Sequence, residues 1–379
     1  MPAYLDHNST TPLDARVLAA MQPFFTGPYA NASSAHRWGR AARDAVEQAR
    51  AQIAALVGAD PGQVIFTSGG TEANNLAVKG IAARRAGRLL YSGIEHPCVY
   101  EPMLALRAQG REVEAIAVDE DGRVDAAAFA EQLKQGPVAL AACMVANNET
   151  GVLQNIPGLA AQVAAAGGVF HADAVQAAGK IPLDFPASGA QLMSLSSHKI
   201  YGPKGVGALI ADRALELEPL LHGGGQERGL RGGTENVAAI VGFGAAAELA
   251  VAELAARAEQ ALALRLRLER ALERFPGVTI FAQHARRLPN TVQFAVPGMH
   301  SATLLGLLDK QGFAVSSGSA CATGSDEPSP VLTAMGVPAD LALCAIRVSV
   351  GKDNTAAEID SFLAALASIV GAPMASVAS

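Results

Sequence analysis

From about residue 60 onward, short apolar runs with β-strand character alternate with helical patterns, and this alternation restricts the fold more than any other feature. Parallel strands need crossover helices between them, so the pattern predicts an α/β fold with a mostly parallel sheet of seven strands. The candidate strands are Val64–Thr67, Leu89–Ser92, Val113–Val118, Val138–Met144, Val169–His171, Leu192–Ser194 and Val206–Ile210, with helices such as Thr71–Ala86 and Asp125–Gln135 between them.

A second domain is expected because single cores stop growing at about 250–300 residues and the chain has 379. Residues Asn236–Phe275 are rich in helix formers, interrupted only by Gly242 and Gly244, and predict a connector out of the first domain. Beyond Pro276 the pattern predicts a smaller α+β domain, with strands Val278–Phe281, Thr291–Phe294 and Ile346–Ser349 and helices Ser301–Gln311 and Thr355–Val370.

Composition narrows the class of protein and its partners. Half of the residues are hydrophobic, but no apolar run approaches the roughly 18 residues that a membrane span needs, and the first residues do not resemble a signal peptide. Lys and Arg number 29 against 35 Asp and Glu, a net charge of −6, and they form no dense basic run of the kind that binds nucleic acid. We therefore expect a cytoplasmic protein that binds small molecules or proteins, with no membrane or nucleic-acid partner.

The four cysteines are Cys98, Cys143, Cys321 and Cys344, and they lack the close paired spacing of zinc or iron–sulfur ligands, so no metal site is predicted. Three of them fit structural roles. Cys321 lies in a run of small residues, Ser316–Ser325, which suits a nucleophilic thiol that must reach a substrate and then a partner. Taken alone, Cys321 fits a reactive and an inert role equally well.

Lys199 lies among hydroxyl residues at a strand end and precedes a glycine-rich turn. Such a lysine can hold pyridoxal phosphate as a Schiff base if its surroundings let the amine lose its proton. Taken alone, the pattern is more typical of a solvated loop lysine. Asp173 stands 26 residues earlier, directly after an apolar strand. It can pair with the pyridinium nitrogen of that cofactor, or cap a helix.

The segment Phe66–Asn75 ends a strand in glycines and a hydroxyl where a helical pattern opens. Free N–H groups at a helix start can hold a phosphate, although the same residues also cap ordinary helices. Neither GxGxxG nor GxxxxGK[ST] occurs in complete form, so dinucleotide and P-loop sites lack support and pyridoxal phosphate fits better.

Together these segments resemble the cysteine desulfurases, which are fold-type-I pyridoxal enzymes of the class-V aminotransferase type. The resemblance rests on Tyr4–Pro12, Asn31–His36, Gly70–Thr71, Glu95–Pro97, Asn147–Gly151, Asp173–Gln176, Ser196–Lys199, Arg231–Asn236, the Cys321 loop and Ile346–Arg347. It implies a large cofactor domain over residues 15–255. It also implies a small domain, built from residues 1–14 and 256–379, that carries the cysteine loop. His7, Ala32 and Ser197 depart from the residues usual in the family.

The resemblance also implies a role for each site residue. Lys199 would bind the cofactor covalently, Asp173 would pair with its ring nitrogen, and His96 would stack on the ring and assist proton transfer. Arg347 would clamp the substrate carboxylate with its planar donor fork. The remaining contacts would be Asn148 and Gln176 at the ring hydroxyl, Asn148 also at the substrate, and Gly70, Thr71, Ser196, His198 and a neighbouring subunit's Thr234 at the phosphate. The last contact implies a homodimer.

The implied reaction removes sulfur from L-cysteine, giving L-alanine and a persulfide on Cys321 for an iron–sulfur scaffold or another sulfur-acceptor protein. The Ser-Gly-Ser-Ala-Cys loop favours delivery to iron–sulfur scaffolds, with a transient cluster contact at Cys321. Three alternatives stay open at this point. They are a selenocysteine lyase, an aminotransferase-like enzyme and a non-catalytic scaffold for sulfur-transfer partners. Alone, His96 fits a loop histidine and Arg347 a surface ion-pair donor.

Overall fold

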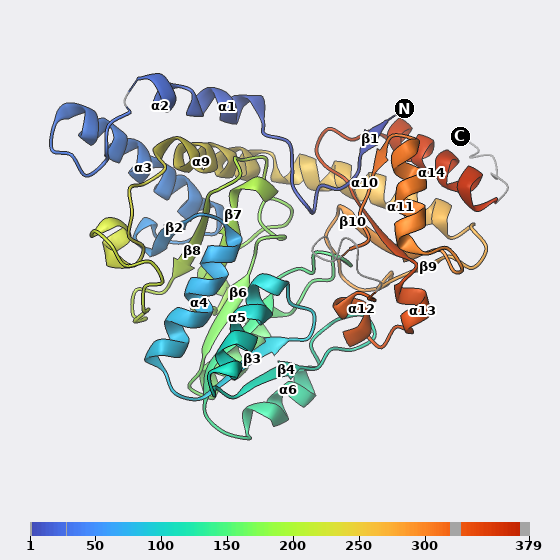
Figure 1. The fold of residues 1–379 in the computed structure, drawn as a ribbon, viewed down its shortest axis with the longest axis horizontal. Coiled ribbons are helices and arrows are strands. Elements are labelled where there is room, and N and C mark those ends of the chain that lie inside the picture. Colours follow the sequence, from blue (N-terminus) through green and yellow to red (C-terminus); the bar gives the residue numbers. More distant parts are fainter. Residues whose placement is uncertain (1, 28, 319–326, 372–379) are drawn as a thin grey trace.

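The computed structural model describes residues 2–27, 29–318 and 327–371 and is built around a seven-stranded sheet (Figure 1). The order of its strands is β2-β8-β7-β6-β5-β3-β4, and β8 alone runs antiparallel to its neighbours. The strands are β2 Val64–Thr67, β3 Arg88–Ser92, β4 Val113–Ile116, β5 Val138–Met144, β6 Val169–Asp173, β7 Leu192–Ser196 and β8 Gly207–Ala211. The predicted mostly parallel seven-stranded sheet is confirmed, with strand ends shifted by one or two residues.

Helices cover both faces of this sheet because successive strand residues point to opposite sides. On one side, Ile65, Leu89 and Leu209 pack against α4 (Gly70–Arg84) and α5 (Pro97–Ala108). On the other, Phe66 and Phe170 pack in one core with the remaining helices of this domain. These helices are α1 Ala15–Met21, α3 Arg37–Leu56, α6 Ala126–Leu133, α7 Ile156–Ala165, α8 Phe185–Ser188 and α9 Val237–Ala252, while the short α2 spans Pro23–Thr26.

The predicted connector consists of two helices, α9 and α10 (Leu254–Leu272), which meet at Glu253 with a bend of 72°. Gly242 and Gly244, which interrupt the run of helix formers in the sequence, both lie inside α9. Gly242 lies against Met21 of α1, and Gly244 lies against Ala49 of α3. A β-carbon at either position would collide with these neighbours, so the glycines permit close helix packing rather than a helix end.

The smaller part of the structure is an α+β unit. Its antiparallel sheet has the order β12-β10-β9, with β9 Thr279–Ile280, β10 Thr291–Ala295 and β12 Ala345–Ser349, and β1 Ala3–Tyr4 pairs with β11 Phe313–Ala314. Its helices are α10, α11 Ser301–Lys310, α12 Pro330–Ala334, α13 Ala339–Ala342 and α14 Ala356–Val370. Leu5 packs in the same core as Phe294 and Phe362. This packing supports the predicted assignment of residues 1–14 to the small domain, which stays a prediction.

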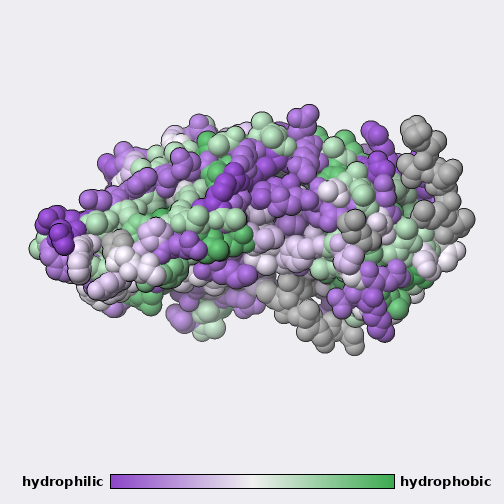
Figure 2. Space-filling model, turned by 90° about the horizontal axis from the view of Figure 1, so that it is seen from above, coloured by the Kyte–Doolittle hydropathy of each residue, from purple (hydrophilic) through white to green (hydrophobic). Residues whose placement is uncertain are grey.

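The face that carries α1 and α2 is a mixture of hydrophilic and hydrophobic patches (Figure 2). Large apolar side chains on and beside α1–α3 are exposed, at Leu13, Leu18, Phe25, Tyr29 and Trp38. Within the described ranges, no single helix is long and apolar enough to cross a membrane. The bent pair α9 and α10 meets that criterion only when the two helices are taken together.

A buried ion pair ties the loop before α9 to the sheet. Arg50 of α3 donates to both carboxylate oxygens of Glu227 at 2.8 Å, and Glu227 also accepts the backbone N–H of Phe66 at 2.8 Å. Both side chains are at most 7% exposed. Removing Glu227 would therefore leave the buried guanidinium of Arg50 with only the exposed carboxylate of Glu47 as a partner.

We expect Glu227→Ala to lower the free energy of unfolding by about 3–5 kcal/mol, because Arg50 loses its buried partner and keeps only the exposed carboxylate of Glu47. Urea denaturation measures this loss. The control is Glu131→Ala, which removes the exposed partner of Lys134 and should change stability by less than about 0.5 kcal/mol. Equal losses in the two variants would contradict the assignment.

Candidate active site

Lys199 lies at the carboxyl edge of the sheet, on a short 3₁₀ turn directly after β7. Its partly buried Nζ donates to the backbone oxygens of Asn8 at 2.6 Å and Ser9 at 2.8 Å. Burial lowers the pKa of Lys199 to about 8, and the positive charge of Arg347 contributes to the same effect. A substantial fraction of this amine is therefore neutral, and nucleophilic, near neutral pH.

Asp173 ends the adjacent strand β6 and is buried. Its Oδ2 accepts from the side-chain amide of Asn74 at 2.7 Å, and its Oδ1 accepts from the backbone N–H of Val175 at 2.9 Å. Residues 175–180 form turns, so the alternative of a helix cap is wrong. Burial raises the pKa of Asp173, and a cationic partner would favour its ionised form.

His96 is the N-cap of α5, where its Nδ1 accepts the backbone N–H of Cys98 at 3.2 Å. The same nitrogen lies 2.9 Å from the sulfur of Cys98. Burial first, and then the charges of Lys199 and Arg347, lower the pKa of His96 to about 4. The ring is thus neutral at physiological pH, and since Nδ1 accepts a hydrogen bond, the proton lies on Nε2.

The phosphate-type motif lies at the N-terminus of α4. Gly69 precedes the helix and no side chain caps it, so first-turn N–H groups there are open to an anion. His198 faces the same region, with its Nδ1 3.0 Å from the hydroxyl of Thr10, and burial lowers its pKa to about 4.

These residues line one cavity of about 210 Å³. The predicted residues that line it are Gly70, Thr71, His96, Asn148, Asp173, Gln176, Ser196, His198 and Lys199. Thr234 is exposed and is not among the residues lining this cavity. Cys321 lies outside the described residues.

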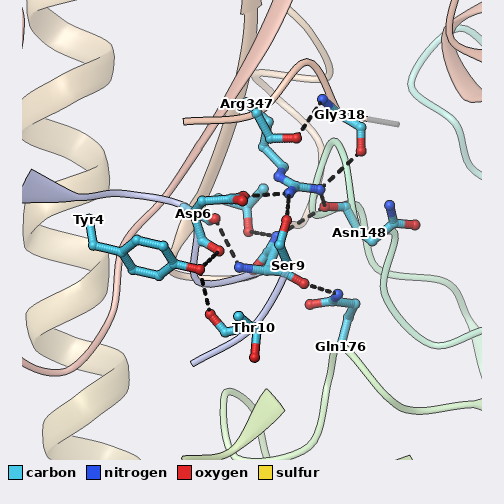
Figure 3. Close-up of polar contacts among 12 residues, drawn as sticks. Tyr4, Asp6, Ser9, Thr10, Asn148, Gln176, Gly318 and Arg347 are labelled. Atoms are coloured by element: carbon cyan, nitrogen blue, oxygen red, sulfur yellow. Dashed lines mark hydrogen bonds and ion pairs between the residues drawn. The ribbon is translucent and has the colours of Figure 1, made fainter. Parts of the chain in front are cut away.

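Arg347 lies beside the cavity and is only 2% exposed, so it is not a surface ion-pair donor. Its Nη2 donates to Asp6 at 2.7 Å and Ser9 Oγ at 2.8 Å, and its Nη1 donates to the backbone oxygens of Asn148 at 3.0 Å and Gly318 at 3.1 Å (Figure 3). It lines a second opening together with His96 and Lys199. The guanidinium therefore faces the space where a substrate bound near Lys199 would extend.

The sequence pattern did not predict a role in the site for Cys98 or Asn8. Cys98, interpreted there as structural, lines the cavity and touches both His96 and the amide of Asn74. Asn8 lies within a segment that carried the resemblance but received no role. Its contacts come from residues far away in the sequence, so no local pattern signalled them.

The three positions that depart from the family's usual residues lie away from the cavity lining. The ring of His7 is buried edge-on against Tyr4, with ring centroids 5.0 Å apart. Together with Lys199 it lines a separate small cavity. Ala32 and Ser197 are also buried.

Comparisons with known proteins agree with this geometry. A family model described as aminotransferase class-V matches residues 3–362. The cysteine desulfurase IscS of Anaeromyxobacter sp. (strain Fw109-5) is 45% identical over 367 residues, covering 95% of this chain and 90% of that protein. This chain belongs to the cysteine desulfurase family.

Solved structures of this family share the fold. A structure titled NifS-like protein superimposes with a TM-score of 0.91 at 37% identity, covering 98% of this chain and all of the other. A structure titled SspA in complex with cysteine gives a TM-score of 0.81 at 33% identity, covering 93% of this chain and 99% of the other. The predicted fold-type-I architecture is confirmed.

In the cofactor-free protein, we expect Lys199 to react faster with pyridoxal phosphate as pH rises through about 8, because only the neutral amine attacks a carbonyl. Stopped-flow absorbance measures the rate. Arg347→Met removes a positive charge that lowers this pKa and should move the midpoint upward, whereas Arg123→Met, at an exposed ion pair, should leave it unchanged. A wild-type midpoint near the ordinary lysine value of 10.5 would show that the amine is not activated.

Proposed function

We propose that this protein is a pyridoxal-phosphate-dependent cysteine desulfurase, which converts L-cysteine to L-alanine and retains the sulfur as a persulfide on Cys321. One observation carries the proposal: the activated amine of Lys199 shares a cavity with Asp173 and His96. Membership of the cysteine desulfurase family supports the same reaction. The SspA structure, titled as a complex with cysteine, shows that a relative of this fold binds this amino acid.

The cavity fits the cofactor that the family implies. Lys199 would bind its aldehyde carbon, the buried Asp173 would face its ring nitrogen, and the open start of α4 would receive its phosphate. The further contacts assigned to the cofactor are Gly70, Thr71, His96, Asn148, Gln176, Ser196, His198 and, from a neighbouring subunit, Thr234. When bound, the cofactor supplies an electron sink for the substrate's α-carbon.

Substrate binding falls to Arg347 and Asn148. A carboxylate offers Arg347 two acceptors in the geometry of its fork, whereas the protein now occupies it with Asp6, Ser9 and two backbone oxygens. The substrate would replace some of these contacts. Its α-carbon would then lie near Lys199, which lines the same opening.

Proton transfer falls to Lys199 and His96. Nζ of Lys199, once neutral, takes the proton from the substrate's α-carbon. His96 has its proton on Nε2 and its Nδ1 occupied, so it donates a hydrogen bond from Nε2 and does not compete as the base.

Sulfur transfer falls to Cys321. Its thiolate attacks the substrate sulfur, so a sulfur–sulfur bond forms while the carbon–sulfur bond breaks, and the carbon skeleton leaves as alanine after protonation. The described residues on either side of its segment are anchored at the site. Arg347 holds the backbone oxygen of Gly318, and Glu149 accepts from the hydroxyl of Ser329 at 2.7 Å. These two contacts, which hold Gly318 and Ser329 at the site, support the proposal that the thiol of Cys321 lies within reach of the cavity.

We also propose a homodimer that passes its sulfur to an iron–sulfur scaffold or another acceptor protein. The exposed apolar side chains of Leu18, Phe25 and Trp38 offer a surface that a second copy can cover. Thr234 is also exposed, as a residue that reaches a neighbouring site must be.

Incubation with pyridoxal phosphate and L-cysteine tests the function. We expect alanine release and a gain of one sulfur on the peptide that contains Cys321. Lys199→Ala and Cys321→Ala should each lose at least about 10³-fold in rate, because each removes a group that reacts covalently. Cys344→Ala, at a buried cysteine outside the cavity, should stay active.

Two results would overturn the proposal. One is full turnover by Lys199→Ala. The other is wild-type protein that stays colourless after the cofactor is added. The preference of the wild-type protein for cysteine or selenocysteine, measured in parallel, separates a desulfurase from a selenocysteine lyase. Loss of cysteine turnover alone in Cys321→Ala is compatible with both.

A further inference from the structure

A second lysine, Lys180, lies beside the cavity and has no part in the steps above. Its partly buried Nζ donates to Asn8 Oδ1 at 2.9 Å and to Gln176 Oε1 at 2.8 Å. Both acceptors are neutral amide oxygens. Burial first, and then the charges of Lys199 and Arg347, lower the pKa of Lys180 well below its usual value. Burying an amine without a carboxylate partner costs stability, which suggests that Lys180 has a role at the site.

Gln176 is buried in the cavity wall with both ends of its amide engaged. Its Oε1 accepts from Lys180, and its Nε2 donates to the backbone oxygen of Asn8 at 2.9 Å (Figure 3). The amine of Lys180 donates to Oδ1 of Asn8 and to Oε1 of Gln176, so the oxygen end of the Gln176 amide turns toward Lys180. Because Oε1 of Gln176 faces Lys180, its Nε2 group is the hydrogen-bond donor on the side of Asn8 and Lys199.

Asn8 joins the two parts of the fold at the same point. Its side chain accepts from Lys180 and from Asn290 at 3.0 Å, and it donates to the backbone oxygen of Asn148 at 3.0 Å. Its own backbone oxygen accepts from Lys199 and Gln176. The amine of Lys180 thus contacts both Asn8, whose backbone oxygen accepts from Lys199, and Gln176 in the cavity wall.

We propose that Lys180 is a positioning residue: it orients the amide of Gln176 as a hydrogen-bond donor toward the ligand in the cavity. The inference rests on the proposed function for the identity of that ligand, pyridoxal phosphate. An oxygen of the ligand beside Gln176 then meets an N–H group. If the amide were reversed, that ligand oxygen would instead face the carbonyl oxygen of Gln176, which would repel it.

Lys180→Met tests this against the control Lys134→Met, which makes the same substitution at a surface lysine that is 69% exposed. We expect the dissociation constant for pyridoxal phosphate to rise about 5- to 20-fold in Lys180→Met. The absorbance maximum of the bound cofactor should shift as well, because the hydrogen bond to its oxygen changes. The control should match wild type in both measurements. If Lys180→Met also matches wild type, the proposal is wrong.

A double-mutant cycle separates positioning from general damage. In the Gln176→Ala background, Lys180→Met should change the dissociation constant by less than about twofold, because the group it orients is already missing. A full, independent effect in that background would mean that Lys180 acts elsewhere.

Thermal unfolding of cofactor-free protein gives a readout that does not depend on the ligand. Gln176→Glu places a carboxylate against Lys180, so its melting temperature should stay within about 2 °C of wild type when Lys180 is present. It should fall by several degrees more when Lys180→Met is added, since the carboxylate then lacks a partner. If Lys180→Met does not fold, Gln176→Glu alone still tests the contact between residues 176 and 180. A large fall in the melting temperature of that single variant would show that the amine of Lys180 does not lie against the carboxylate. Wild-type protein that binds no pyridoxal phosphate would instead defeat the proposed function, and this thermal comparison would still stand.

Discussion

A lysine amine loses its proton near neutral pH only where water is scarce and other cations are close, and the arrangement around Lys199 meets both conditions. The amine rests on the backbone oxygens of Asn8 and Ser9, with Arg347 nearby. Neutral acceptors hold the amine in place without restoring the affinity for a proton that a carboxylate would give it. The rest of the site is arranged around this one group.

The sheet and its helices bring the other groups to that amine. Asp173 and Lys199 follow neighbouring strands, β6 and β7, and the carboxyl ends of parallel strands meet at one edge. The starts of α4 and α5 face the same space and supply an uncapped helix end and His96. Arg347 adds positive charge beside this space, which favours ligands that carry a carboxylate. Neutral histidines at positions 96 and 198 keep that charge from growing further.

Patterns in the sequence predicted the features that depend on residues close together in the chain, such as the ends of strands. The apolar runs before Asp173 and Lys199 placed both residues at strand ends, because a buried parallel strand is apolar throughout and ends where polar residues begin. The resemblance then assigned the residues that line the cavity. Helix α3 was not predicted, since no helix or strand was predicted for the chain before residue 60. The roles of Asn8 and Cys98 were also missed, because their partners come from distant elements and no spacing along the chain reports them.

The pairing of β1 with β11 has a consequence for how the protein matures on the ribosome. Residues 3 and 4 are synthesised long before their partners, residues 313 and 314, and Asn8 is held by Ser349 and Asn290. The backbone oxygens that receive Lys199 can therefore reach their final places only after residue 349 has been synthesised, and until then the nascent chain holds this lysine in an incomplete cavity. Contacts of such long sequence separation make this closing step slow compared with formation of the helices.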